Sequence, residues 1–312
     1  MSAQARVASY RHEAMLWRGV DDFLAGCVPF IREGIAAEEP VMVASTRERV
    51  GLLQEALGTD ADAVRFVDME ELGANPARII PAWASFVRDA GGRASRGIGE
   101  PIWAGRSPAE IAECQLHERL LNLALTEDTP LWLRCPYDVE GLPGAVIDEA
   151  ERSHPAVTDT SQASTRTQPY AGPGHAWSAF TSPLPEPPSV QVVVEFGEGD
   201  LRRVREAVVL SAERCGVPVD RVADLALAVH ELAANSVVHG GGHGVLRIWC
   251  EARALLCEVA DRGQVLDPLT GRHQVGPEGA SGRGLWMVNH LCDLVQLRSS
   301  GSGTVVRVHT WT

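Results

Sequence analysis

Lysine is missing from this sequence, and all 28 basic side chains among its 312 residues are arginine. The absence excludes the phosphate-binding lysine of P-loop enzymes and the strand lysine of protein kinases. It also excludes Schiff-base chemistry and Ser–Lys dyads, because both need an amine. A phosphate group would therefore have to be held by backbone amides, by arginine or through a metal ion.

Long apolar runs are missing too. No stretch approaches the roughly 20 apolar residues that a membrane-spanning helix needs. No apolar segment follows the opening residues MSAQARVASYRHEAMLW either. We therefore expect neither a membrane span nor a secretion signal, and we expect a cytoplasmic protein.

The seven cysteines are odd in number and include no C-x-x-C pair. Scattered cysteines of this kind are typical of a reducing compartment, where we expect them to serve as small core residues. No set of histidine, cysteine and acidic residues shows the spacing of metal ligands along the chain. The sequence therefore predicts no zinc site.

The formal charge of −13 is concentrated in the first half of the chain. Residues 1–152 contain 15 arginines and 25 acidic residues, whereas residues 189–312 contain 12 arginines and 14 acidic residues. A strongly acidic half argues against direct binding to nucleic acid or to an anionic membrane surface.

Residues 10–150 alternate between short β-rich runs and segments of helical period. VMVAS is one of the strand-like runs, and the segment after Ser107 is one of the capped helices. This alternation predicts an α/β domain with a mainly parallel sheet and helices on both faces.

Residues 153–188 contain seven of the 19 prolines and few aliphatic side chains. This composition predicts a linker with polyproline character near its end. The sequence therefore predicts three parts, namely an N-terminal domain over 1–152, the linker over 153–188 and a C-terminal domain over 189–312.

The N-terminal part contains the segments FIREGIAAEEPVMVAS, GEPIWAGRSPAEIAECQLHERLLNLAL and LWLRCPYD. These segments resemble those of the MEDS sensory domain. The resemblance implies a RecA-like α/β domain that senses small hydrocarbon-like molecules or other signals. Since the segment contains no Walker loop, we do not expect it to hydrolyse nucleotide.

The triplet His117-Glu118-Arg119 is similar to the one that carries the phosphoacceptor of histidine kinases. No proline follows it, and no second dimerisation helix comes after. We therefore expect a partly exposed helix face, with a pocket role for Glu113, His117 or Glu118 as the alternative. His12 is expected to make local hydrogen bonds rather than to bind a metal.

The helix predicted over Val222–Gly241 organises the second half of the chain. Glu231, Asn235 and His239 stand four residues apart, so they project from one face of this helix. Three glycine-containing motifs follow, namely Asp261-Arg262-Gly263, Gly282-Arg283-Gly284 and Gly303-Thr304. An acid and an amide on one helix face, followed by these motifs in this order, predict a nucleotide site.

The order of these motifs resembles the GHKL ATPase/kinase superfamily and, within it, the RsbW-type anti-sigma factor kinases. The resemblance implies a histidine-kinase-like (Bergerat) α/β sandwich, in which helices cover one face of a mixed sheet. It also implies that the domain binds ATP together with Mg²⁺.

The same resemblance implies roles for individual residues. Asn235 would bind Mg²⁺ through its amide oxygen, a hard ligand that suits this ion. Asp261 would accept a hydrogen bond from the adenine amine, and Glu231 would act as base toward a serine or threonine hydroxyl. His239 is expected to be structural. The other expected contacts to ATP are Gly263, Gly282, Arg283, Gly284, Leu285 and Thr304, with Arg272 as a further candidate.

By resemblance the chain is an anti-sigma regulatory factor that senses a signal through its N-terminal domain. It would sequester a sigma factor and phosphorylate a serine or threonine of an anti-anti-sigma (STAS) partner, and proteins of this type often pair as homodimers. Two alternatives stay open, namely an ATP-binding module without phosphotransfer and a divergent sensor histidine kinase. The second is disfavoured because no helical phosphoacceptor domain precedes residue 189.

Overall fold

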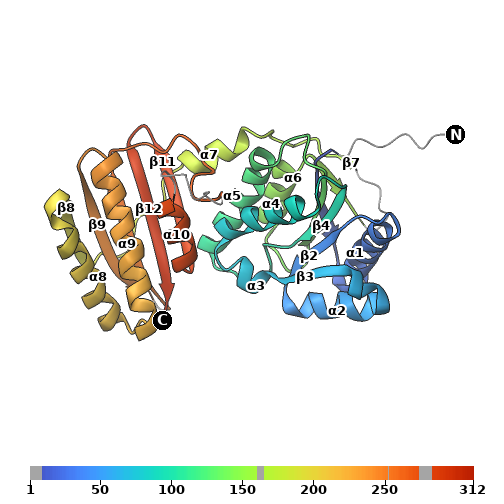
Figure 1. Cartoon of the computed structure of the whole chain (residues 1–312), viewed down its shortest axis with the longest axis horizontal. Coiled ribbons are helices and arrows are strands. Elements are labelled where there is room, and N and C mark those ends of the chain that lie inside the picture. The colour runs from blue at the N-terminus through green and yellow to red at the C-terminus, as the bar shows by residue number, and fades with distance from the viewer. Residues whose placement is uncertain (1–8, 160–164, 252, 274–282) are drawn as a thin grey trace. The chain divides into compact units, whose positions relative to one another are not determined.

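The computed structural model describes residues 9–159, 165–251, 253–273 and 283–312 (Figure 1). The chain divides into two compact units, Met1–His175 and Ala176–Thr312. Within the described ranges, no helix combines the length and the apolar character that crossing a bilayer requires.

The first unit is built on a seven-stranded sheet with the order β3-β2-β4-β5-β1-β6-β7. All its ladders are parallel except that between β6 and β7, which confirms the predicted mainly parallel sheet. Its strands are β1 (Arg11–Trp17), β2 (Val41–Ser45), β3 (Val64–Asp68), β4 (Ser95–Gly99), β5 (Leu131–Asp138), β6 (Ala156–Thr158) and β7 (Thr165–Arg166).

Helices connect these strands because parallel neighbours need a crossover. Thr46 caps α2 by accepting a hydrogen bond from the Arg49 N–H, and Ser107 forms a capping box with Glu110 at the start of α5. The helices are α1 (Gly19–Ala36), α2 (Arg47–Leu57), α3 (Met69–Leu72), α4 (Ile79–Asp89), α5 (Pro108–Ala124) and α6 (Gly144–Ser153), with 3-10 turns η1 (Gly58–Ala63) and η2 (Pro76–Arg78).

Buried side chains of β1 point alternately to the two faces of the sheet, so both faces are covered. Met15 packs with Phe23 of α1 in one apolar cluster. His12 projects from the opposite face and meets Glu118 of α5. Because successive residues of a strand point to opposite sides, helices cover the sheet from both sides, as predicted.

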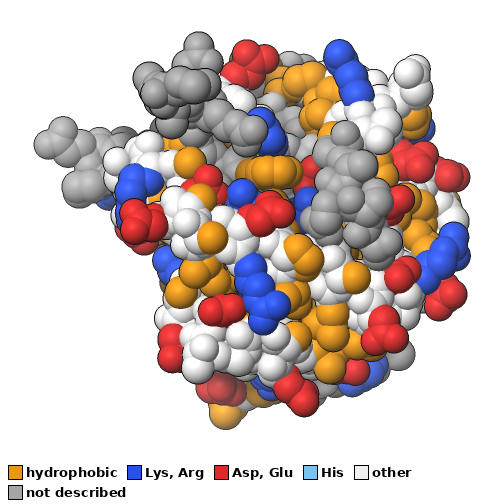
Figure 2. Space-filling view, turned by 90° about the vertical axis from the view of Figure 1, so that its right-hand side faces the viewer, with side chains coloured by type: hydrophobic (Ala, Val, Ile, Leu, Met, Phe, Trp, Pro, Cys, Tyr) orange, Lys and Arg blue, Asp and Glu red, His pale blue; other side chains and the backbone are white. Residues whose placement is uncertain are grey.

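Charged side chains of both signs are interspersed on the face of the molecule shown in Figure 2. Exposed ion pairs such as Arg32–Asp60 and Arg65–Asp89 belong to the first unit. Mixed signs of this kind keep a surface soluble, and each exposed pair contributes little to stability.

The segment predicted as a linker contains elements of both units. β6 pairs with β1, and β7 pairs with β6. After them comes α7 (His175–Thr181), whose Phe180 is buried in the core of the second unit. Arg307 of that unit also donates to the Pro185 carbonyl oxygen at 2.8 Å. The prolines lie beside these short elements rather than within them, so proline content alone did not reveal them.

The second unit has a five-stranded sheet with the order β11-β12-β10-β9-β8. All ladders between its described neighbours are antiparallel, whereas a mixed sheet was expected. Its strands are β8 (Val192–Gly197), β9 (His243–Glu251), β10 (Ala254–Asp261), β11 (Leu294–Ser300) and β12 (Gly303–Trp311). Its other elements are η3 (Glu198–Asp200), α8 (Leu201–Cys215), α9 (Val219–His239) and α10 (Arg283–Leu291).

The connections explain this difference. α8 and α9 both lie between β8 and β9, and two successive helices return the chain so that the next strand runs antiparallel. β10 and β11 do run in the same direction, because each is antiparallel to β12, which lies between them. The fold class, α/β with helices on one face of the second sheet, is confirmed (Figure 1).

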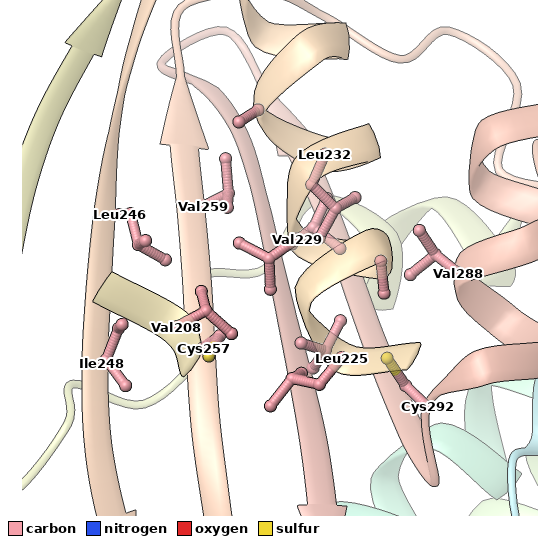
Figure 3. Packing of buried hydrophobic residues seen from close by; sticks show 14 of the residues in the cluster. Val208, Leu225, Val229, Leu232, Leu246, Ile248, Cys257, Val259, Val288 and Cys292 are labelled. Carbon is pink, nitrogen blue, oxygen red and sulfur yellow. The ribbon is translucent and has the colours of Figure 1, made fainter. Parts of the chain in front are cut away.

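α9 lies over the core of the second unit (Figure 3). Leu225, Val229 and Leu232 project from one side of this helix into the buried cluster. Leu246 and Val259 meet them from β9 and β10. Each such side chain gains about 1.5–3 kcal/mol on burial, so this stripe fixes the rotation of α9 about its axis. The rotation in turn fixes where the polar residues of α9 project.

Two of the cysteines depart from the prediction. Cys215, the last residue of α8, and Cys250 of β9 form a disulfide. They are 35 residues apart, and α9 lies between them in the sequence, so spacing gave no sign of the pairing. The other five are buried, as expected of small core residues.

Candidate functional site

The polar face of α9 borders a cavity of 420 Å³. A cavity of this size falls in the range of small-molecule sites. Its wall also includes residues from β10, from the chain after β10, from the start of α10 and from β12. Six of the residues expected to contact ATP or Mg²⁺ lie in this wall, namely Asn235, Asp261, Gly263, Gly284, Leu285 and Thr304.

Asp261 ends β10 and is held in place by two hydrogen bonds. The Ser236 hydroxyl donates to Oδ2 at 2.6 Å, and the Gly263 N–H donates to Oδ1 at 2.7 Å. Each carboxylate oxygen has two lone pairs, so both can accept a further hydrogen bond from a ligand. The two bonds fix the orientation of the carboxylate at the cavity wall.

Glycine lets the end of α9 approach the chain after β10. A Cβ on Gly263 would lie 2.6 Å from the His239 carbonyl oxygen and 2.9 Å from the Gly240 Cα. A Cβ on Gly240 would in turn lie 2.5 Å from the Asp261 carboxyl carbon. All three distances are shorter than real Cβ contacts, so the local shape of the cavity depends on these two glycines.

Thr304 helps to hold the same wall from β12. Its hydroxyl donates to the Gly263 carbonyl oxygen at 2.9 Å and lies 2.8 Å from the Ser299 hydroxyl. Ser299 accepts a hydrogen bond from the Val265 N–H at 2.9 Å. Residues 263–265 are therefore tied to the last two strands.

The first turn of α10 lies beside α9. A Cβ on Gly284 would come within 3.2 Å of Glu231 Oε2 and 3.3 Å of Asn235 Nδ2. The glycine thus brings the start of α10 close to the two polar residues of α9 that were predicted to carry chemistry. The N–H groups of a first helical turn are free to bind an anion.

The remaining predicted residues differ in their relation to this cavity. Glu231 borders Gly284 but is not part of the wall, and Arg283 is exposed as the first residue of α10. Arg272 is buried just before the gap in the described residues. His239 lines the cavity and is exposed. Gly282 lies outside the described residues.

Sequence reasoning missed three residues that support the site. Ser236 and Ser299 hold Asp261 and residues 263–265, and Asn289 of α10 donates to the Gly271 carbonyl oxygen at 2.9 Å. The position of Ser236, directly after Asn235 on the predicted helix, was a usable signal. No local signal in the sequence pointed to Ser299 or Asn289, because their partners lie in other elements.

A second group of polar residues is buried in the first unit. The prediction of a partly exposed helix face is wrong, since Glu113, His117 and Glu118 are buried. Four potential metal-ligand atoms also lie within 4.8 Å of one another, although the sequence showed no metal-ligand spacing along the chain. They belong to His12, Glu118, Cys135 and His154. These residues come from β1, α5, β5 and the residue after α6, so spacing along the chain did not reveal them.

Two family profiles match the sequence. Residues 11–155 match the methanogen/methylotroph, DcmR sensory domain (MEDS), and residues 196–310 match the histidine kinase-like ATPase domain. The chain joins a MEDS domain to a histidine kinase-like ATPase domain. Both domain resemblances drawn from the sequence motifs are thereby confirmed.

No curated protein matches the MEDS–ATPase chain. Among solved structures, it is similar to the RsbU and RsbW domains of a protein from Mycobacterium tuberculosis, with 18% identity and a TM-score of 0.29. The match covers 38% of this chain and 32% of that one, so the chain spans about a third of its length.

Proposed function

We propose that the histidine kinase-like ATPase domain binds ATP with Mg²⁺ in the cavity beside α9. The observation that carries this proposal is the convergence of Asp261, Asn235 and Gly284 on one cavity, from β10, α9 and α10. The residues suit the ligand, because Asp261 keeps lone pairs for an amine donor and Asn235 offers an amide oxygen. A side chain at Gly263 would disturb this wall.

Each residue has a defined part in this proposal. Asp261 accepts a hydrogen bond from the adenine amine, while Gly263 and Thr304 shape the pocket for the base. Asn235 holds Mg²⁺, which neutralises phosphate charge when it is bound. Gly284 and Leu285 present backbone N–H groups to phosphate at the start of α10. Gly282, which lies outside the described residues, is proposed as a further contact to ATP. Arg283, and Arg272 from the preceding segment, supply positive charge without lysine.

Glu231 is the proposed catalytic base. It lies one helical turn before Asn235 and beside Gly284, where phosphate is expected. From this position the carboxylate would accept the proton of an attacking serine or threonine hydroxyl.

The proposed biological role is that of an RsbW-type anti-sigma regulatory factor in the cytoplasm. The ATPase domain would sequester a sigma factor and phosphorylate a serine or threonine of a STAS partner, with a homodimer as the working unit. The MEDS domain would take the signal, in the form of a small-molecule ligand. The proposal keeps a MEDS domain within residues 1–152 and an ATPase domain within residues 189–312, and the segment between them adds short elements to each unit. The resemblance of the nucleotide motifs supports this role.

Phosphotransfer from labelled ATP to candidate STAS proteins tests the proposal. Glu231→Gln keeps the shape of the side chain but not its basicity, so ATP should still bind while transfer falls by roughly 10²–10⁴-fold. Glu213→Gln removes an exposed glutamate from α8 and serves as the matched control. Transfer by Glu231→Gln at the wild-type rate would show that this residue is not the base.

The alternatives give different results in the same assay. Binding of ATP without transfer to any partner would favour a module that only switches its affinity for partners. A phosphohistidine on the chain would favour a histidine kinase. We expect none at His117, because its side chain is buried in the first unit and out of reach of a partner active site.

A further inference from the structure

Four polar side chains meet inside the MEDS domain, and we call them the His–Cys–Glu cluster. His12 of β1 and Cys135 of the neighbouring β5 project from the same face of the sheet. Glu118 reaches them from α5, and His154 follows the last residue of α6. All four are at most 3% exposed. Burial of so many polar atoms is costly unless each of them has a partner.

Hydrogen bonds on the outer side of the cluster fix the tautomer of His12. Asn122 uses its Nδ2 to donate to the carbonyl oxygens of Glu118 and Ser153, so its Oδ1 is an acceptor. His12 Nδ1 lies 3.0 Å from this oxygen and must carry the proton. The lone pair of His12 Nε2 therefore points inward, toward Glu118 Oε2 at 3.1 Å.

His154 is fixed in the same way. Its Nδ1 lies 2.8 Å from the Ala150 carbonyl oxygen, which can only accept, so Nδ1 carries the proton. Its Nε2 then also presents a lone pair to Glu118 Oε2, at 3.4 Å. This nitrogen makes no hydrogen bond to any residue in the described part of the chain.

The atoms that face the centre of the cluster are therefore mostly hydrogen-bond acceptors with too few donors between them. Two imidazole nitrogens, one carboxylate oxygen and one thiol sulfur face one another, and only the thiol brings a hydrogen of its own. A proton added to one imidazole still leaves the other lone pair facing the carboxylate. A cation at the centre would satisfy all four atoms at once.

Four of the six distances between these atoms match the edges of a tetrahedral site. With bonds of about 2.0–2.3 Å to zinc, two N or O ligands lie about 3.3 Å apart, and sulfur lies about 3.6 Å from either. The nitrogen-to-oxygen distances are 3.1 and 3.4 Å. Cys135 Sγ lies 3.5 Å from both His12 Nε2 and Glu118 Oε2. The other two distances, from His154 Nε2 to His12 Nε2 and to Cys135 Sγ, are at most 4.8 Å.

We propose that His12, Glu118, Cys135 and His154 bind one divalent transition-metal ion, with zinc as the cation that fits best. The mixed N, O and S ligands in tetrahedral arrangement favour zinc over the hard ions magnesium and calcium. Asn122 and the Ala150 carbonyl act as outer partners that orient the two imidazoles. Four protein ligands close the site, so the ion would link β1, β5, α5 and the end of α6.

Metal content of the full chain tests the proposal. Protein purified without chelator, or reconstituted with zinc and passed through a desalting column, should retain one zinc per chain. Removal by a chelator should lower the melting temperature, and added zinc should restore it. Cys135→Ala should lose both the zinc and this response. Cys114→Ala removes a buried cysteine of α5 outside the cluster and should keep both.

The same experiment separates this site from the nucleotide site. Asn235→Ala should retain zinc, because Asn235 lies in the other unit and binding is measured without nucleotide. Absence of zinc from a folded wild-type chain, or equal zinc in Cys135→Ala, would overturn the proposal.

X-ray absorption at the zinc edge gives a test that needs no variant. The wild-type chain should show one sulfur at about 2.3 Å and three nitrogen or oxygen ligands at about 2.0–2.2 Å. A first shell with no sulfur, or with two or more, would place the ion elsewhere and refute the assignment. Zinc affinity should fall with decreasing pH, as protons compete for the thiolate and the imidazoles.

Discussion

Asp261 shows how one side chain can serve both the fold and the ligand. Its two oxygens accept hydrogen bonds from Ser236 and from the Gly263 N–H, and they retain lone pairs toward the cavity. The carboxylate therefore reaches the ligand already oriented, and little freedom is lost on binding.

We expect Asp261→Asn to weaken ATP binding. The variant amide turns one acceptor into a donor, which replaces the oxygen bonded either to the Gly263 N–H or to the Ser236 hydroxyl, and it removes the negative charge that favours the ligand amine. Loss of one charge-assisted hydrogen bond costs about 1.5–3 kcal/mol, and calorimetry measures it. Asp200→Asn is the matched control, since Asp200 also accepts a backbone hydrogen bond, from the Gly197 N–H. Equal loss in both variants would point to a general effect on the fold.

Glu100 links the stability of the first unit to pH. Burial raises the pKa of its carboxyl from 4.5 to about 7, although Arg49 and Ser45 favour the charged form. Between these two values the folded chain holds a proton that the unfolded chain has released. The contribution of Glu100 to stability therefore falls as the pH rises from 4.5 to about 7.

A Glu100→Gln variant should lack this dependence. Its melting temperature should rise relative to the wild type as the pH increases across this window, because only the wild type has a buried carboxyl to ionise. Thermal unfolding at both ends of the window measures the difference. Glu55→Gln, at an exposed position of α2, should show no such trend. A constant difference for Glu100→Gln would contradict the raised pKa.

Among the elements, α9 was the most predictable from the sequence. The helical spacing of Leu225, Val229 and Leu232 predicted both the helix and its buried side. It thereby also predicted the side on which Glu231 and Asn235 lie. The two helix caps at Thr46 and Ser107 were equally local signals, because cap and partner are three residues apart.

Contacts between elements were the part that the sequence did not reveal. His12 and Glu118 are 106 residues apart, and no local pattern relates them. The antiparallel second sheet was missed because the direction of β9 depends on two helices acting together. Ser299 and Asn289 likewise acquire their roles only when β12 and α10 are in place.

The contact between α9 and β10 should be intolerant of added volume. Gly263→Ala places a methyl group 2.6 Å from the His239 carbonyl oxygen, and overpacking of this kind costs about 1–3 kcal/mol. We expect a lower melting temperature together with weaker ATP binding. Gly301→Ala, in the turn between β11 and β12, meets no atom within 4 Å and is the control. A Gly263→Ala variant as stable as the control would show that this contact can relax.

At the scale of the whole molecule, the second unit begins before the matched ATPase segment. Phe180 of α7 belongs to its core, and the Pro185 carbonyl accepts from Arg307. A boundary at residue 189, as predicted from the proline content, would cut both contacts away.

We therefore expect Phe180→Ala to destabilise the second unit in the full chain by about 3–5 kcal/mol. Chemical denaturation with a probe in the ATPase domain measures the change. A fragment of residues 176–312 should be more stable than one of residues 189–312 for the same reason. Trp177→Ala, which removes a half-exposed side chain of the same helix, is the control. Equal stability of the two fragments would show that α7 does not contribute to the second unit.

The place of β12 between β10 and β11 affects how the second unit is made on the ribosome. β10 and β11 leave the exit tunnel before β12 does. In the sheet β12 lies between them, so β10 and β11 do not pair with each other. Until residue 311 has emerged, the nascent sheet has an unpaired edge at β10 and a solitary strand at β11. Such edges are templates for aggregation, so this unit should depend on a chaperone or on slow release during synthesis.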